Sequence, residues 1–151
     1  LVFAKEWTLK GVRDAFENRR TLIYDRHFVM GREEWLTPLF ESCIDLITKA
    51  LSSNKSGKAL IRITNNSDIP IMIKTNYSSD AYTLTEKISI LPQTTEILTL
   101  RFNEEANPGV YYLNIPITVT NFLKNPRQGI NSTLKLKVIN KRTKKRRGNS
   151  H

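Results

Sequence analysis

Residues 111–119 read YYLNIPITV, and this stretch decides the fold expected for the chain. Its apolar residues fall at every second position from Tyr111 to Val119 and alternate with mostly polar ones. Because successive side chains of a strand point to opposite faces, this period predicts a β-strand with one buried face. At least one of Tyr111 and Tyr112 should then be buried. Pro116 has no amide hydrogen for a sheet, which favours an edge or a bulge at that position.

The same period of two recurs on both sides of this stretch. Turn-forming residues separate the repeats at 54–57, 65–68, 107–109 and 125–129. About seven short strands with one apolar face each need a second sheet to cover that face. The sequence therefore predicts a mainly β fold, an immunoglobulin-like antiparallel β-sandwich over residues 43–140. The apolar positions of the other strands are Ala59, Ile61 and Ile63; Ile69, Ile71 and Ile73; Leu98, Leu100 and Phe102; and Leu134, Leu136 and Val138.

A short α/β segment of two helices and a hairpin is expected before the sandwich. Thr8 is a candidate N-cap for an amphipathic helix over residues 8–19, whose apolar face is carried by Leu9, Val12 and Phe16. The two tryptophans, Trp7 and Trp35, both fall in this segment, as expected if it has its own packing surface.

The hairpin and the second helix follow. Residues 21–24 and 27–31 read as two short strands joined by a tight turn at Asp25 and Arg26. A second helix should begin at Arg32 and carry Leu36, Leu39, Phe40 and Cys43 on one face. Pro38 is expected to kink or restart this helix.

Charge is unevenly distributed along the chain. The 151 residues hold 24 Lys and Arg against 14 Asp and Glu, a formal net charge of +10. Six of the basic residues lie in residues 141–151, so the rest of the chain carries +4 and residues 1–42 are neutral. This pattern predicts a solvated, disordered basic tail and does not favour specific nucleic-acid binding. No apolar run approaches the roughly 20 residues of a membrane span.

Candidate catalytic residues are few, and we expect no catalytic, cofactor-binding or metal-binding residue in this chain. Cys43 is the single cysteine, which excludes an intrachain disulfide and favours a buried core thiol. His27, two residues from Asp25, makes at best a fragment of a metal site. Glu33 and Glu34 are neighbours on the expected helix, so their side chains would point about 100° apart and would not converge on one site.

Three further sets of residues are weaker candidates for a binding site. Glu104 and Glu105 lie in a turn and are expected to face solvent, with calcium binding as the alternative. Four Asn-x-Ser/Thr sequons occur in or near predicted turns, where asparagine supports the turn itself; they begin at Asn54, Asn65, Asn76 and Asn131. An exposed aromatic strip could bind sugar, and its candidates are Tyr77, Tyr82, Tyr111 and Tyr112.

Several motifs resemble one known segment. They are LVFAKE at residues 1–6, GVRDAF at 11–16, NRRT at 18–21, GREEWL at 31–36 and PLFE at 38–41, with TNF at 120–122 and PRQG at 126–129. Together they resemble the end of the catalytic domain, with its β-rich extension, in bacterial phosphoesterases of the polymerase-and-histidinol-phosphatase (PHP) superfamily of the Bacteroidetes type. The resemblance implies an upstream barrel that holds divalent metals (Zn, Mn or Fe). Its metal-ligand motifs precede the region seen here, so no ligand residue is carried over.

These observations lead to one expected organisation. Residues 1–42 are a remnant of the end of a PHP-like barrel, residues 43–140 an immunoglobulin-like sandwich and residues 141–151 a basic tail. The chain itself is expected to be non-catalytic, to pack on or position an upstream phosphoric ester hydrolase, and to meet a polymeric substrate or envelope component. The alternative is an independent carbohydrate- or protein-binding module of the cell envelope. The sequence does not decide the cellular compartment, and the bacterial periplasm or the exterior are the expected locations.

Overall fold

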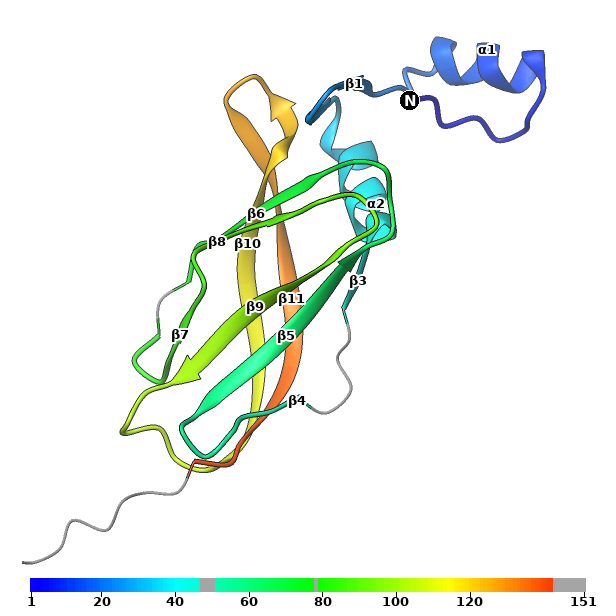
Figure 1. Cartoon of the computed structure of the whole chain (residues 1–151). Helices are drawn as coiled ribbons and strands as arrows, with labels where there is room; N and C mark the ends of the chain where they lie inside the picture. Colours follow the sequence, from blue (N-terminus) through cyan, green and yellow to red (C-terminus); the bar gives the residue numbers. More distant parts are fainter. Residues whose placement is uncertain (47–50, 78, 143–151) are drawn as a thin grey trace, which may run out of the picture.

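A computed structural model describes residues 1–46, 51–77 and 79–142 of the chain (Figure 1). Two helices, α1 (Leu9–Glu17) and α2 (Glu33–Cys43), accompany a set of mostly antiparallel strands. The predicted mainly β fold, preceded by two helices and a hairpin, is confirmed. The strands are β1 (Ile23–Asp25), β2 (Phe28–Met30), β3 (Ile44–Leu46), β4 (Leu51–Ser52), β5 (Lys58–Asn65), β6 (Ile71–Thr75), β7 (Tyr82–Leu84), β8 (Lys87–Ile90), β9 (Thr95–Phe102), β10 (Gly109–Asn125) and β11 (Gln128–Asn140).

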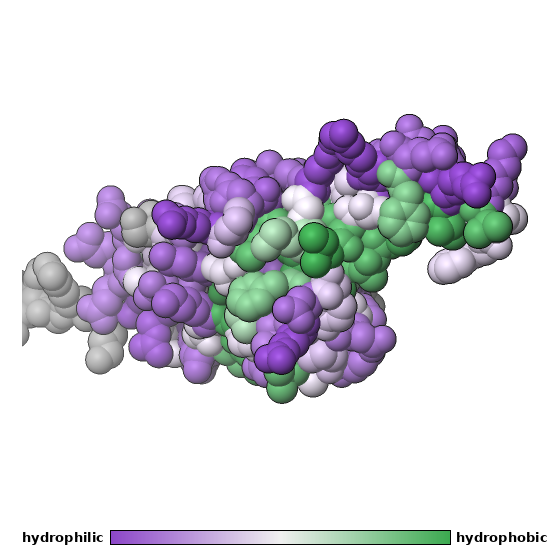
Figure 2. Space-filling view, turned by 90° about the horizontal axis from the view of Figure 1, so that it is seen from above, coloured by the Kyte–Doolittle hydropathy of each residue, from purple (hydrophilic) through white to green (hydrophobic). Residues whose placement is uncertain are grey.

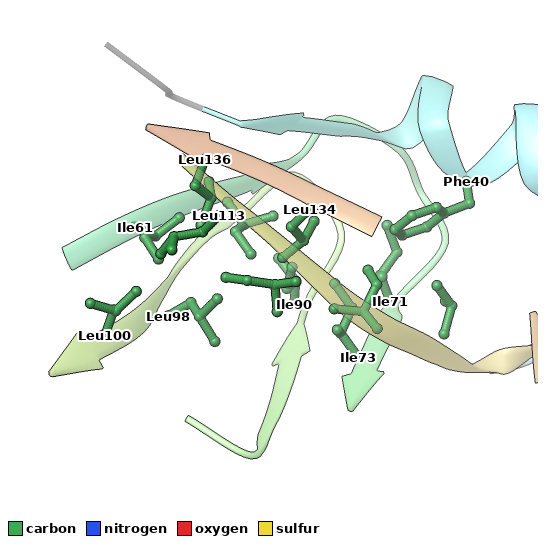
Figure 3. Close-up of a cluster of buried hydrophobic side chains, with 14 of the residues drawn as sticks. Phe40, Ile61, Ile71, Ile73, Ile90, Leu98, Leu100, Leu113, Leu134 and Leu136 are labelled. Atoms are coloured by element: carbon green, nitrogen blue, oxygen red, sulfur yellow. The ribbon is translucent and has the colours of Figure 1, made fainter. Parts of the chain in front are cut away.

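The strands form two sheets. The larger sheet has the order β1-β2-β10-β11-β4, and β6 joins it through β10 and carries β8 on its other edge. The smaller sheet has the order β3-β5-β9-β7. Apolar side chains from both sheets meet between them, as Figure 3 shows for Ile61 and Leu98 of the smaller sheet and Leu113 and Leu134 of the larger one. The two-layer arrangement follows from the period of two along each strand.

The number and length of the strands differ from the sequence expectation. Nine described strands, β3 to β11, lie in the region expected to hold about seven. Four of the nine, β3, β4, β7 and β8, have only two to four residues each, too few for a period of two to be recognised. Conversely, β10 and β11 are long, with 17 and 13 residues, and form one hairpin that runs from one end of the molecule to the other.

Helix α2 packs into the same core as the sandwich. The ring of Phe40 meets that of Phe122 edge-on at a centroid distance of 6.0 Å. Leu22, Val29 and Leu36 belong to the same buried cluster. In Figure 3, Phe40 lies beside Ile71. The hairpin and α2 therefore share apolar contacts with the sandwich, and the division of the chain at residue 43 stays a prediction.

Pro38 does not interrupt α2, so the helix does not restart there, and the alternative, a kink at Pro38, stays a prediction. The helix runs unbroken from Glu33 to Cys43 with Pro38 inside it. Proline costs the helix one backbone hydrogen bond. Burial of Leu36 and Phe40 on either side favours the helical backbone through this position.

The first helix and the hairpin match their predictions with shifted bounds. Thr8 caps α1 as predicted, and its Oγ1 accepts a hydrogen bond from the Gly11 amide at 3.0 Å. The helix ends at Glu17, because Asn18 bonds back to Asp14 and Arg19 adopts a positive φ of 53°. In the hairpin, the turn is one residue later than expected, at residues 26–27.

Pro116 lies in an interior strand, at the end of its pairing with β6, and not at a bulge. Its pairing with Thr133 of β11 lies within a continuous register. On its other side, β6 pairs with β10 from Ile117 to Val119, and the Pro116 carbonyl accepts from the Asn76 amide at 3.2 Å. The irregular register comes after Val119, where β2 joins β10.

No described helix is long and apolar enough to cross a membrane. The predicted disordered tail falls mostly outside the described residues, which end at residue 142.

Candidate functional site

The two candidates for metal or nucleophilic chemistry lie apart. Cys43 is buried in the core with 4% of its surface exposed, as predicted for a structural thiol. His27 is exposed in the hairpin turn and Asp25 is exposed at the end of β1. Among the residues that the structure describes, no three His, Cys, Asp or Glu side chains gather as a metal site would require.

The paired glutamates form separate ion pairs at the surface. Glu33 accepts from Lys124 at 3.2 Å, and Glu34 accepts from Arg32 at 3.3 Å. Glu104 accepts from Arg142 at 3.4 Å and is almost fully exposed. The structure thus gives each of these three carboxylates a basic partner, and surface pairs of this kind contribute little to stability.

The structure does not bring the four candidate tyrosines together as an exposed strip. Tyr82 is buried, stacks on Tyr77 at 5.6 Å and meets the edge of Phe102 at 6.2 Å. The ring of Tyr111 lies 4.8 Å from that of Phe102, so Tyr111 is the half-buried member of its pair. Burial, followed by the neighbouring Tyr77, raises the pKa of the Tyr82 hydroxyl. Only Tyr112, with 76% of its surface exposed, stands free of this internal stack.

Two of the four sequon asparagines stabilise turns, as the sequence suggested. Asn54 Oδ1 accepts from the amides of Ser56 and Lys58. Asn65 is fully buried, and its amide group donates to the Ile69 carbonyl at 2.8 Å.

The other two sequon asparagines, Asn76 and Asn131, lie on the exterior of the larger sheet, where both bond to one threonine. Asn76 donates to Thr118 at 2.5 Å, and Thr118 donates to Asn131 at 3.0 Å.

The N-terminal lobe, defined here as residues 1–31, exposes many of its apolar side chains. Helix α1 turns its small residues Gly11 and Ala15 inward, and a Cβ at Gly11 would overlap the Glu6 carbonyl. Its predicted apolar face points outward instead, since Leu9 is 81% and Phe16 60% exposed. The lobe's exposed apolar residues are Leu1, Val2, Trp7, Leu9, Phe16, Ile23, Tyr24 and Phe28. Figure 2 shows apolar surface extending from the end of the sandwich into this lobe.

Two buried polar atoms in and beside this lobe have no hydrogen-bond partner in the described part of the chain. One is Nε of Arg20, whose guanidinium also pairs with Asp14. The other is Nε1 of Trp35, whose ring stacks on Phe3 at 5.5 Å. Buried polar groups are nearly always satisfied in complete folds. Sequence patterns could not have revealed these two atoms, because their burial depends on tertiary contacts.

Comparison with known proteins decides the family. Residues 44–135 match a family model described as an Ig-like domain. The chain belongs to this Ig-like domain family. No curated protein is similar enough to match the Ig-like chain.

One solved structure is similar over most of the Ig-like chain. It is a two-domain protein from Bacteroides vulgatus that contains a predicted PHP-like metal-dependent phosphoesterase, with 30% sequence identity and a TM-score of 0.74. The similarity covers 89% of this chain but only 37% of that protein. The suspected relationship to the C-terminal part of such a protein is confirmed, and the Ig-like chain spans little more than a third of its relative.

Two other structures are more distant. The YadV chaperone has 13% sequence identity to this chain and a TM-score of 0.48. The similarity covers 71% of this chain and 55% of the chaperone. A protein of unknown function from Porphyromonas gingivalis also has 13% identity, over 65% of this chain and 46% of its own, with a TM-score of 0.41.

Proposed function

We propose that the Ig-like chain is the non-catalytic C-terminal region of a metal-dependent phosphoesterase, and that its N-terminal lobe packs on the upstream hydrolase domain. The exposed apolar side chains of that lobe are the observation that carries the proposal. Trp7 is fully exposed, and Leu9 and Phe16 are mostly exposed, at the end of the molecule where the chain begins. Burying one such side chain contributes roughly 1.5–3 kcal/mol. A contact that covers several of them would hold two domains together.

The architecture of the Bacteroides relative supports the same proposal. The Bacteroides relative has the PHP-like phosphoesterase in a two-domain chain, of which the present chain matches 37%. Divalent metals (Zn, Mn or Fe) and the groups that bind them would belong to the upstream domain.

The proposal is tested in the full-length parent with matched substitutions. A triple variant with Trp7→Ser, Leu9→Ser and Phe16→Ser removes the apolar surface of the lobe. A double variant with Leu60→Ser and Ile97→Ser removes apolar residues that are each 46% exposed on the smaller sheet. We expect the triple variant to uncouple the unfolding of the two domains in calorimetry, while the double variant keeps the parental transition. Equal behaviour of the two variants would refute the packing role.

Catalysis is tested separately on the Ig-like chain alone. Phosphoesterase assays with added manganese or zinc should give no turnover for this chain and metal-dependent turnover for the parent. Turnover by the short chain would overturn its non-catalytic assignment.

A further inference from the structure

One exterior face of the larger sheet carries four lysines. Strands β6, β8, β10 and β11 contain no aspartate or glutamate. Their register places Lys137 opposite Tyr112 and Lys135 opposite Asn114 on the outward side. We call this surface the basic face. Farther along the same side, Lys74 lies between Thr118 and Lys87. The outward residues of the basic face are Lys74, Lys87, Tyr112, Asn114, Thr118, Asn131, Thr133, Lys135 and Lys137.

Tyr112 gives the basic face a flat apolar contact. Its side chain is 76% exposed, and the Lys137 ammonium lies 5.7 Å from its ring centroid. An exposed aromatic ring beside a cation can pack on the face of a sugar ring while the cation meets an acidic substituent. In contrast, the rings of Tyr82 and Tyr111 are occupied by internal packing.

Hydroxyl and amide groups lie between the two pairs of lysines. Thr118 accepts from Asn76 and donates to Asn131, so three polar side chains are held in fixed positions. Asn76 and Asn131 border a shallow depression of about 400 Å³ that is also lined by Pro116 and Thr133. Asn131 lies four residues from Lys135, or roughly 13 Å along the strand. The lysine pairs are therefore separated by a neutral, hydrogen-bonding stretch.

We propose that the basic face binds an acidic polysaccharide of the polyuronide class. Such a chain carries carboxylates for the lysines and hydroxyl groups for the asparagines and threonines between them. A nucleic acid fits less well, because double-stranded DNA carries one charge about every 1.7 Å of its axis. Four lysines spread over the face do not match that density, and β6, β8, β10 and β11 hold no arginine. This proposal is independent of the packing of the N-terminal lobe.

The test uses the whole chain and an oligogalacturonide as the probe, with binding measured by calorimetry at low and moderate salt. The double variants Lys135→Glu with Lys137→Glu, and Lys74→Glu with Lys87→Glu, should each weaken binding at least about tenfold. Tyr112→Ala should weaken it about fivefold. The matched control, Arg62→Glu with Arg101→Glu, makes the same charge change on exposed residues of the smaller sheet and should stay within about twofold of the parent.

Four results would overturn the proposal. The first is no binding of the oligogalacturonide at all. The second is an equal loss in the control and the lysine variants, which would mean attraction by net charge or by the basic tail. The third is equal binding of a neutral glucan of the same length, and the fourth is tighter binding of a single-stranded oligonucleotide with the same number of charges. Circular dichroism of each variant confirms that the fold is retained.

Discussion

The side-chain amide of Asn121 donates a hydrogen bond to the main-chain carbonyl of His27 at 2.7 Å, across 94 positions of the chain. The same nitrogen donates to the Pro70 carbonyl at 2.6 Å, and the side-chain oxygen accepts from the Met72 amide at 2.9 Å. Asn121 is fully buried. One side chain thus joins the hairpin turn, the approach to β6 and the irregular part of β10.

Asn121→Ala should destabilise the chain by about 2–4 kcal/mol, because it leaves three backbone groups in buried or partly buried positions without this partner. Asn121→Asp should be at least as harmful, since a carboxylate cannot donate to two carbonyls. Urea unfolding followed by circular dichroism measures the change. The exposed Asn114→Ala is the control and should alter the free energy of unfolding by less than about 0.5 kcal/mol. Comparable losses at both positions would show that the buried bonds contribute little.

Gly129→Ala should destabilise the β10–β11 hairpin. A Cβ at Gly129 would overlap the carbonyl oxygen of Val119, which is backbone and cannot move aside without distorting the ladder. We expect a loss of about 2–4 kcal/mol in urea unfolding. Thr133→Ala, at an exposed position of the same strand, should be nearly neutral. An unchanged midpoint for Gly129→Ala would mean that the turn relaxes freely.

Truncation of two phenylalanines should cost very different amounts of stability. Phe40→Ala removes a ring that is 1% exposed and packs on Phe122, and should cost about 3–5 kcal/mol. Phe16→Ala removes a ring that is 60% exposed and should cost less than about 1 kcal/mol in this chain. Thermal unfolding of both variants checks the difference. A large cost at Phe16 would show that α1 is already covered within the chain.

Stability should fall at alkaline pH partly because of Tyr82. Burial raises the pKa of its hydroxyl, so the folded chain holds the phenolic proton more tightly than the unfolded chain does. Its contribution is therefore complete below the unfolded pKa of about 10 and is lost as the pH rises above it. Urea unfolding from about pH 8 to about pH 11 should show a shallower fall for Tyr82→Phe than for the parent. Tyr112→Phe, at an exposed position, should keep the parental slope; identical slopes for all three proteins would contradict the prediction.

The sequence predicted those features that depend on local pattern. Alternation placed Ile61, Ile63 and Leu113 in the core, and the helix cap at Thr8 followed from its position before an apolar run. Strands as short as β7 and β8 are set by pairing with distant strands, so their own residues do not reveal them. The continuity of α2 through Pro38 likewise depends on what Leu36 and Phe40 contact.

The candidate surfaces were predictable only in part. Tyr112 was recognised as a candidate, but its separation from Tyr82 and Tyr111 requires the register of β10 and the position of Phe102. The basic face arises because lysines from three strands, β6, β8 and β11, fall on one side, which no single segment shows. The outward apolar face of α1 reverses the usual reading of an amphipathic helix, because the close approach of Glu6 to Gly11 fixes which side turns inward.

The long hairpin of β10 and β11 also has a mechanical consequence. Strand β2 joins β10 near the hairpin turn, whereas the chain leaves β11 at the far end of the molecule (Figure 1). A pull between the N-terminal lobe and a polymer held beyond the sandwich would act along these strands. Their many hydrogen bonds would then bear the load together in shear instead of opening one at a time. Such a pull would be resisted by the whole β10–β11 ladder rather than by its last pair alone.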